Sequence, residues 1–264
     1  AQDRRGDYPG QGRGNKLAGQ GMRLLIDAGN TRLKWQLGDR QQIIASGIGD
    51  VASADPLPGL PSEPRVRRIS ISTVAAESRR EALVTHLESR FGVPAVCHWS
   101  ESDRGGLKNA YRDYQRMGAD RWHAMYGAWL RHRDGFAVVD ASSAVTVDYV
   151  DRTGQHLGGF ILPGLRMMIR SLQTDAARIL FDPEQVLQTA PGVSTGECVN
   201  HGLAWLSAAM IDRIRADVEN FSLSDVLVTG GDAERLQGLG LNAVHMPDLV
   251  LRGLAAIDAE ELAI

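Results

Sequence analysis

Apolar positions along the chain follow two different periods, which together predict alternating strands and helices. Short apolar runs and alternation with a period of two are typical of strands, whereas a spacing of three and four residues is typical of an amphipathic helix. The elements expected before residue 138 are a β-hairpin over 23–39, strands over 41–48, 66–73 and 93–98, and helices over 77–91 and 118–131. A strand, a helix and a further strand in succession favour a parallel pair with a crossover, so we expect an α/β fold.

The layout of the first half begins again near Val139. An apolar strand that ends in Asp, a turn of small residues, an alternating strand and a third strand occur over 23–48 and again over 139–162. The further elements expected are helices over 163–180, 195–220, 232–239 and 249–262, and strands over 225–229 and 243–245. This repetition predicts two α/β halves, 22–138 and 139–264. Residues 1–21 have the composition of a disordered leader or of a remnant of an expression vector.

Charge and composition narrow the classes of function. With 29 basic and 32 acidic side chains the formal net charge is −3, and we expect no nucleic-acid partner, because phosphate-backbone binding needs a concentrated basic face. No run approaches the ~20 apolar residues of a membrane span. Cys97 and Cys198 lie far apart, which disfavours a disulfide framework or structural zinc and is typical of a cytoplasmic protein.

The turn after the first strand is a candidate phosphate site. Small residues let backbone N–H groups approach an anion, and Asn30 and Thr31 add side-chain donors. Asp27 could hold Mg²⁺ through water, and Lys34 could neutralise phosphate charge. Taken alone, an ordinary hairpin with Asp and Asn as turn formers explains the same residues equally well.

A second copy of this turn strengthens the phosphate interpretation. Asp140 and Ser143 repeat the layout of the first turn, and two such hairpins that face each other can hold the phosphates of a nucleotide between them. The Gly-Gly pair after Thr229 stands between a predicted strand and a predicted helix, where backbone could receive adenosine or a phosphate.

Two further candidates lie at predicted helix starts. Asp120 and Arg121 follow Gly118 at the head of a helix and could serve as a base and an anion clamp. From spacing alone, an acid that merely stabilises its helix is the more favoured interpretation. Thr195 is expected to be the N-cap of the helix over 195–220.

The order of these motifs resembles the type III pantothenate kinases, the family that includes the Bvg accessory factor proteins. The resemblance covers residues 22 to about 257, and its motifs are IDAGNTRLKW, NAYRDYQRMGADRW, VVDASSAVTVDYV with HLGGFILPGLRMM, and VLVTGGDAERL with MPDLVLRGL. It implies duplicated ribonuclease H-like halves of the acetate and sugar kinase, Hsp70 and actin (ASKHA) superfamily. It also implies ATP-dependent phosphorylation of pantothenate to 4′-phosphopantothenate, the first step of coenzyme A biosynthesis.

The resemblance implies a role for each matching residue. Asp120 matches the general base, and Asp140 matches the position of a monovalent cation, K⁺ or NH₄⁺. The ATP-binding positions are Asp27, Ala28, Gly29, Asn30, Thr31, Arg32, Leu33, Lys34 and Ser143. The substrate-contacting positions are Tyr111, Gly118, Ala119, Asp120, Arg121 and Thr195. Arg121 would bind the pantothenate carboxylate. The family also implies a homodimer, with the pantothenate site completed near the subunit interface.

One motif departs from the family pattern. The second phosphate motif usually reads Asp-x-Gly-Thr-Ala, whereas this chain has Ser142 in place of Gly and Ser143 in place of Thr. A left-handed backbone at residue 142 would cost roughly 1–2 kcal/mol for serine. Two alternatives therefore stand beside an active pantothenate kinase. One is a catalytically impaired ATP-binding or regulatory accessory protein of the same family, and the other is an enzyme of this fold with a different small hydroxyl acceptor.

Overall fold

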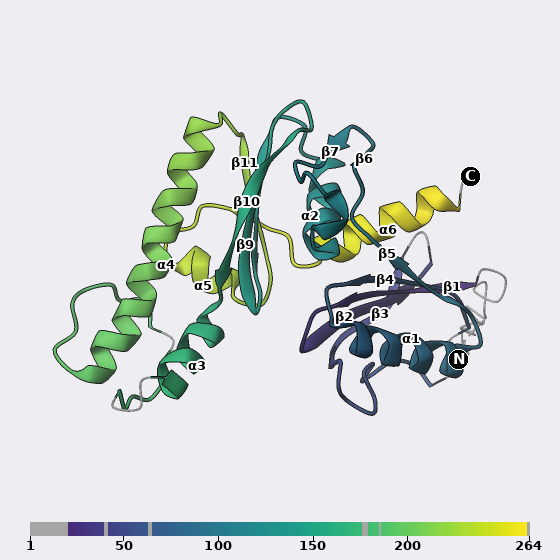
Figure 1. Ribbon diagram of the computed structural model, residues 1–264, viewed down its shortest axis with the longest axis horizontal. Coiled ribbons are helices and arrows are strands. Elements are labelled where there is room, and N and C mark those ends of the chain that lie inside the picture. Colours follow the sequence, from purple (N-terminus) through teal and green to yellow (C-terminus); the bar gives the residue numbers. More distant parts are fainter. Residues whose placement is uncertain (1–20, 40–41, 63–64, 176–178, 185, 263–264) are drawn as a thin grey trace, which may run out of the picture.

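Two five-stranded sheets with the same strand order form the framework of the molecule (Figure 1). The structure is a computed structural model that describes residues 21–39, 42–62, 65–175, 179–184 and 186–262. The first sheet has the order β3-β2-β1-β4-β5 and the second the order β10-β9-β8-β11-β12. Since the two halves share one topology, the duplication predicted from the sequence is confirmed.

The first sheet combines an antiparallel meander with a parallel extension. Its strands are β1 (Met22–Ala28), β2 (Arg32–Gly38), β3 (Ile43–Asp50), β4 (Val66–Thr73) and β5 (Ala95–His98). β1, β2 and β3 pair antiparallel, whereas β4 runs parallel to both β1 and β5. Helix α1 (Glu77–Phe91) is the crossover between β4 and β5, and its buried Leu83 and Leu87 join the core on one face of the sheet.

The second sheet repeats these pairings. Its strands are β8 (Phe136–Ala141), β9 (Ala144–Val150), β10 (His156–Pro163), β11 (Asp225–Thr229) and β12 (Val244–His245). β8, β9 and β10 form the antiparallel meander, and β11 runs parallel to β8 and β12. Asp27 and Asp140 are each the last residue but one of the first strand of their sheet, so the repeat places them at equivalent positions.

Helices cover the two faces of the second sheet differently. Alternate residues of β8 enter two clusters: Phe136 and Val138 pack with α2 (Ala119–Trp129) and α6 (Leu249–Glu261), while Ala137 and Val139 pack with α4 (Thr195–Asn220) and α5 (Ala233–Gly238). Figure 1 accordingly shows α2 and α4 on opposite sides of β9 and β10. Helix α3 (Leu165–Asp175) follows β10.

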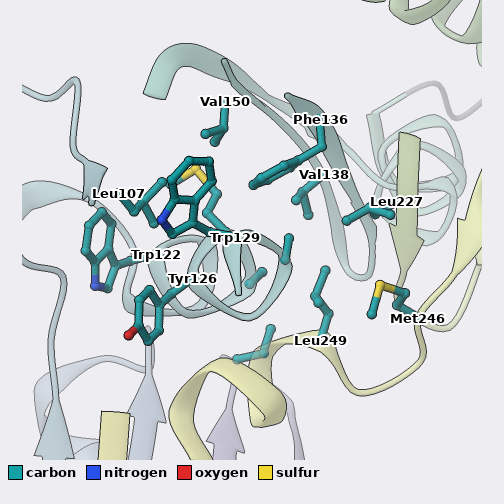
Figure 2. Packing of buried hydrophobic residues seen from close by; sticks show 14 of the residues in the cluster. Leu107, Trp122, Tyr126, Trp129, Phe136, Val138, Val150, Leu227, Met246 and Leu249 are labelled. Atoms are coloured by element: carbon teal, nitrogen blue, oxygen red, sulfur yellow. The ribbon is translucent and has the colours of Figure 1, made fainter. Parts of the chain in front are cut away.

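Helices α2 and α6 cross with their backbones in contact. A Cβ atom on Gly253 of α6 would lie 1.8 Å from the carbonyl oxygen of His123, and one on Gly127 of α2 would lie 2.7 Å from that of Leu249. Aromatic side chains pack around this crossing, and Figure 2 shows the cluster extending from Trp122 and Tyr126 at one end to Leu227 and Met246 at the other.

Helix α6 comes from the second half of the chain but also covers the first sheet. Leu25 of β1 packs against Leu251 and Leu254. Near the end of the helix, the fully buried carboxylate of Asp258 accepts hydrogen bonds from Arg68 and Ser70 of β4. α6 therefore links the two sheets through apolar and ionic contacts.

Several boundaries differ from the sequence predictions. The helix expected over 163–180 begins at Leu165 and is described as far as Asp175, and Ile179 and Leu180 are not helical. The prediction that Thr195 is an N-cap is wrong, because Ser194 is the cap and its Oγ accepts a hydrogen bond from the Glu197 N–H group at 3.3 Å. The pair β6 (Asp103–Arg104) and β7 (Leu107–Lys108) was not expected.

Some predictions fall outside the described part of the chain. The leader predicted over 1–21 does so apart from Gly21, as does the start of the strand predicted from Gln41. Among the helices of the described residues, none is long and apolar enough to cross a membrane.

Candidate active site

Three aspartates from different elements come together where the two sheets face each other across α2. Asp27 lies near the end of β1, Asp140 near the end of β8, and Asp120 in the first turn of α2. They interact electrostatically: both Asp120 and Asp140 raise the pKa of Asp27, and Asp140 raises that of Asp120. The fold therefore assembles residues that are 93 and 113 positions from Asp27 in the sequence.

Burial is the main cause of the shifted pKa values in this cluster. Loss of water raises the pKa of Asp27 to about 8 and that of Asp120 to about 6, and it also raises the pKa of Asp140. The Arg121 N–H group donates to Asp120 Oδ1 at 2.7 Å, which limits the rise at Asp120. The positive charge of Lys34 does not balance three neighbouring carboxylates, so the site favours the binding of cations.

The first phosphate turn presents its backbone and exposed side chains. Asn30, Thr31 and Arg32 are exposed, while Ala28 and Leu33 are buried in the core. Ala28 and Leu33 can therefore meet a ligand only through their backbone. The Gly29 N–H group donates to the Arg32 carbonyl at 3.0 Å, which closes the turn.

Lys34 reaches from the first half of the chain to the second. Its Nζ donates to the Pro247 carbonyl at 3.2 Å, and Thr229 Oγ1 donates to the same oxygen at 3.1 Å. Its charge lowers the pKa of both Asp27 and Asp140. The next residue, Asp248, raises the pKa of Asp27. Sequence reasoning missed Asp248, although it stands within the MPDLVLRGL motif.

The second phosphate turn is free of the strain considered for Ser142. Among the non-glycine residues that the structure describes, Ser222 has the one positive φ angle, so the backbone at Ser142 is not left-handed. The Ser142 hydroxyl donates to Asp140 Oδ1, and Ser143 is exposed. Gly230 packs against this turn at φ +92°, where a Cβ atom would lie 2.6 Å from Asp140 Oδ1.

The candidate acceptor residues gather at the start of α2. Gly118 is the N-cap residue, and a Cβ atom there would lie 2.6 Å from Asp120 Oδ1, so glycine makes room for that carboxylate. Ala119 is buried. The Arg121 guanidinium is already engaged: Nε and Nη2 donate to Asp148 at 2.9 and 2.6 Å, and Nη1 donates to the Tyr111 hydroxyl at 2.7 Å.

Thr195 is the candidate residue that lies apart from the others. It is exposed at the first residue of α4, on the face of the second sheet opposite to α2 (Figure 1). Within one chain, Thr195 and Asp120 therefore lie on opposite sides of the sheet.

The donor set favours a cation shared with a ligand over one held by protein alone. No group of three or more His, Cys, Asp and Glu side chains able to hold a metal occurs among the residues that the structure describes. A site with one or two carboxylates, completed by water and phosphate oxygens, is the coordination that Mg²⁺ prefers.

Comparison with known proteins adds independent findings. A family model described as type III pantothenate kinase matches residues 23–217. The type III pantothenate kinase of Marinobacter nauticus is 56% identical over 237 residues, which cover 89% of this chain and 98% of that protein. That of Ectopseudomonas mendocina is 38% identical over 244 residues, which again cover 89% and 98%.

Solved structures show the fold. A conserved putative Baf family transcriptional activator from Campylobacter jejuni matches with a TM-score of 0.58 at 20% identity, over 91% of this chain and 100% of that one. The ADPNP-bound activator of 2-hydroxyisocaproyl-CoA dehydratase from Clostridium difficile gives 0.50 at 12%, over 92% and 96%. The two sheets of equal topology and the match to these structures over nine-tenths of the chain show a duplicated α/β fold, in agreement with the two ribonuclease H-like halves expected from the sequence.

Proposed function

This chain belongs to the type III pantothenate kinase family, and we propose that its aspartate cluster carries out the ATP-dependent phosphorylation of pantothenate. The primary hydroxyl oxygen of pantothenate forms a bond to the γ-phosphorus of ATP, and the bond to the β-γ bridging oxygen breaks to release ADP. The products are 4′-phosphopantothenate and ADP, and the reaction is the first step of coenzyme A biosynthesis. The convergence of Asp27, Asp120 and Asp140 is the observation that carries the proposal.

Asp120 is the proposed general base. A carboxyl group with a pKa of about 6 is mostly ionised at neutral pH and is still basic enough to accept the hydroxyl proton as the phosphoryl group moves. Its place in the first turn of α2 puts it beside Gly118, Ala119 and Arg121, the proposed acceptor-binding positions.

The two turns are the proposed holders of the ATP phosphates. The first turn, Asp27 to Lys34, offers backbone N–H groups and the exposed Asn30 and Thr31 side chains, and Ser143 offers its hydroxyl from the second. We place Mg²⁺ at Asp27, through water, and a monovalent cation, K⁺ or NH₄⁺, at Asp140. Bound there, the cations would neutralise charge on the transferring phosphoryl group. The raised pKa values of these two carboxyl groups support both placements.

A homodimer would explain how Thr195 can take part in the pantothenate site although it lies apart from the other candidate residues. Since Thr195 lies across the second sheet from Asp120 within one chain, we propose that the Thr195 of a second copy completes each pantothenate site. Exposed apolar side chains on that face of the second sheet support this contact, among them Phe160 of β10 and Trp205 of α4, which are 49% and 61% exposed. We further propose that the two halves expected over 22–138 and 139–264 are the two domains, with the boundary moved to precede β8, which begins at Phe136. We also propose that the protein works in the cytoplasm.

A catalytically impaired member of the family remains the second candidate function. The hydrogen bond from Ser142 to Asp140 favours it, because that bond occupies one oxygen of the carboxylate assigned to the monovalent cation. The absence of a left-handed backbone at Ser142 favours the active enzyme instead.

The test is ADP release by the purified chain with MgATP, KCl and pantothenate, with each component omitted in turn and with Ser142→Gly in parallel. Turnover that needs both pantothenate and K⁺ is the expected result. Activity in Ser142→Gly alone would establish the impaired member. Without activity in either protein, a screen of other small hydroxyl acceptors would decide between a different substrate and a non-catalytic role.

A further inference from the structure

A hydrogen-bonded network of four side chains, three of them buried, links β9 and β10 to the start of α2. His156 Nε2 lies 3.0 Å from Asp148 Oδ1, Asp148 binds the Arg121 guanidinium with both oxygens, and Arg121 Nη1 donates to the Tyr111 hydroxyl. His156 and Asp148 are each 1% exposed and Arg121 is 6% exposed. The Tyr111 ring also stacks on that of His156, with ring centroids 6.4 Å apart.

The hydrogen bonds define which group donates and which accepts at each step of this network. The Ala110 N–H group donates to His156 Nδ1 at 3.4 Å, so the proton of the neutral ring is on Nε2 and is donated to Asp148. Asp148 therefore accepts from His156 on one side and from Arg121 on the other. Held by three donor atoms, its carboxylate has a fixed orientation.

The HLGG segment of β10 leaves space for these hydrogen-bonded side chains. A register shift lies between His156 and Gly158, and Gly158 has a φ of +110°, which only glycine adopts readily. A Cβ atom on Gly159 would lie 2.5 Å from Asp148 Oδ1 and 3.0 Å from Arg121 Nη2. Gly158 is therefore explained by its backbone conformation, and Gly159 by the ion pair and the strand backbone beside it.

Stability alone does not account for such an ion pair. Removal of two charged groups from water costs about as much as their attraction returns, so apolar residues of similar volume would stabilise the fold as well or better. The pair adjoins Asp120, and its outer end is the partly exposed Tyr111. Because the Tyr111 hydroxyl accepts from Arg121, its own proton stays free for a ligand.

We propose that Asp148 and His156 are positioning residues that hold Arg121 and Tyr111 for the carboxylate end of the acceptor. The inference rests on the proposed function and extends it. The carboxylate of pantothenate accepts from the Tyr111 hydroxyl and from the remaining N–H of Arg121 Nη1, while Asp148 and His156 touch no substrate. They act by fixing where these two donors lie.

The test compares His156→Leu with His156→Gln, and Asp148→Asn with Asp217→Asn. Gln keeps an N–H donor near the position of Nε2, whereas Leu removes it. Asp217 is a matched control on the other face of the sheet, since it is 3% exposed and pairs with Arg213 and the Tyr149 hydroxyl at 2.9 and 3.0 Å. Each variant is assayed with pantothenate and with pantothenol, in which a hydroxymethyl group replaces the carboxylate.

We expect His156→Leu and Asp148→Asn to raise the KM for pantothenate about tenfold or more, with the KM for ATP unchanged. His156→Gln and Asp217→Asn should keep the KM of the unmodified protein, and pantothenol should be used equally by all. An equal loss with both acceptors, or an equal effect of Asp148→Asn and Asp217→Asn, would overturn the inference. Calorimetric titration with pantothenate makes the same comparison if turnover is absent, which separates failure of the kinase proposal from failure of this one. If the unmodified chain binds no pantothenate, both proposals fail.

Discussion

The partly buried carboxyl group of Asp27 makes the fold less stable when it is ionised, although the proposed cation site needs it ionised. Its pKa rises from 3.8 to about 8 in the folded chain, so the folded state holds this proton more tightly than the unfolded state does. Between about pH 4 and 8 the contribution of Asp27 to the free energy of unfolding should therefore fall as pH rises. Asp27→Asn removes this titration while keeping the shape of the side chain.

We predict that the Tm of Asp27→Asn exceeds that of the unmodified protein, and that the difference grows from pH 5 to pH 8 in buffer without Mg²⁺, K⁺ or NH₄⁺. MgATP should shrink the difference at pH 8, because bound cations stabilise the ionised carboxylate. Scanning calorimetry measures both effects, with the exposed Asp113→Asn as control. A difference that stays constant with pH would contradict the raised pKa of Asp27.

Asp120 is expected to matter for the rate and not for nucleotide binding. Loss of a general base typically lowers turnover by about 10²–10⁴-fold. We predict a fall of this size in the kcat of Asp120→Asn, while calorimetric titration gives a Kd for MgATP close to that of the unmodified protein. Turnover near normal would exclude Asp120 as the base.

The pKa of Asp120 also predicts a pH profile. A base with a pKa of about 6 in the free enzyme should make kcat/KM for pantothenate fall about tenfold per pH unit below that value. Initial rates from pH 5 to 8 measure this slope. A profile that is flat down to pH 5 would assign proton acceptance to another group.

Candidate residues were easier to predict than their contacts. Asp27, Asp120 and Asp140 became candidates through their places in two similar turns and at a helix start, and the family resemblance gave them their expected roles. The partner of Arg121 was not, because Asp148 lies 27 positions away in the sequence and no local pattern relates a helix start to the middle of a later strand. His156 likewise gained meaning only when β10 was placed beside β9.

The close crossing of helices α2 and α6 requires glycine, which has no Cβ atom, at the points of contact. A Cβ atom on Gly253 would overlap the His123 carbonyl oxygen at 1.8 Å. We predict that Gly253→Ala lowers the free energy of unfolding by at least about 1 kcal/mol, because the helices must move apart to make room for the methyl group. Urea denaturation gives this value.

Gly202→Ala is the matched control for that prediction. Gly202 also lies inside a helix, α4, but a Cβ atom there has nothing within 4 Å. Alanine at this position should leave stability unchanged or raise it by about 0.5–1 kcal/mol, because glycine is the poorer helix former. A similar loss in both variants would show that helix propensity, and not the crossing, governs the result at Gly253.

Elements with strong periodicity were predicted within a few residues, and short ones were not. Alternation in β2 and β9 identified both meanders and thereby the duplication. β6 and β7 have two residues each, too few to show any period. The N-cap of α4 was misplaced by one residue because Ser194 and Thr195 carry the same capping hydroxyl group, and only the backbone geometry distinguishes them.

The proposed dimer predicts that a complete pantothenate site needs residues from two copies of the chain. In a symmetric dimer each site would combine Asp120 of one copy with Thr195 of the other. Asp120→Asn and Thr195→Val should each be nearly inactive. A mixed dimer of the two variants nevertheless contains one intact site.

Co-expression of the two variants should therefore restore about a quarter of the unmodified activity, since about half of randomly formed dimers are mixed and each has one working site. Light scattering gives the oligomeric state, and ADP release gives the activity. If the co-expressed preparation is no more active than the separate variants, Thr195 and Asp120 do not share a site.

Helix α6 also has a consequence for how the chain assembles during synthesis. All strands of the first sheet lie within residues 22–98, but the helix that covers Leu25 and binds Arg68 and Ser70 begins only at Leu249. A ribosome therefore makes about 150 further residues after β5 before α6 can cover its part of that face. The sheet that is synthesised first is thus completed only when the last helix has been made, and we expect nascent chains that lack α6 to expose this surface to chaperones.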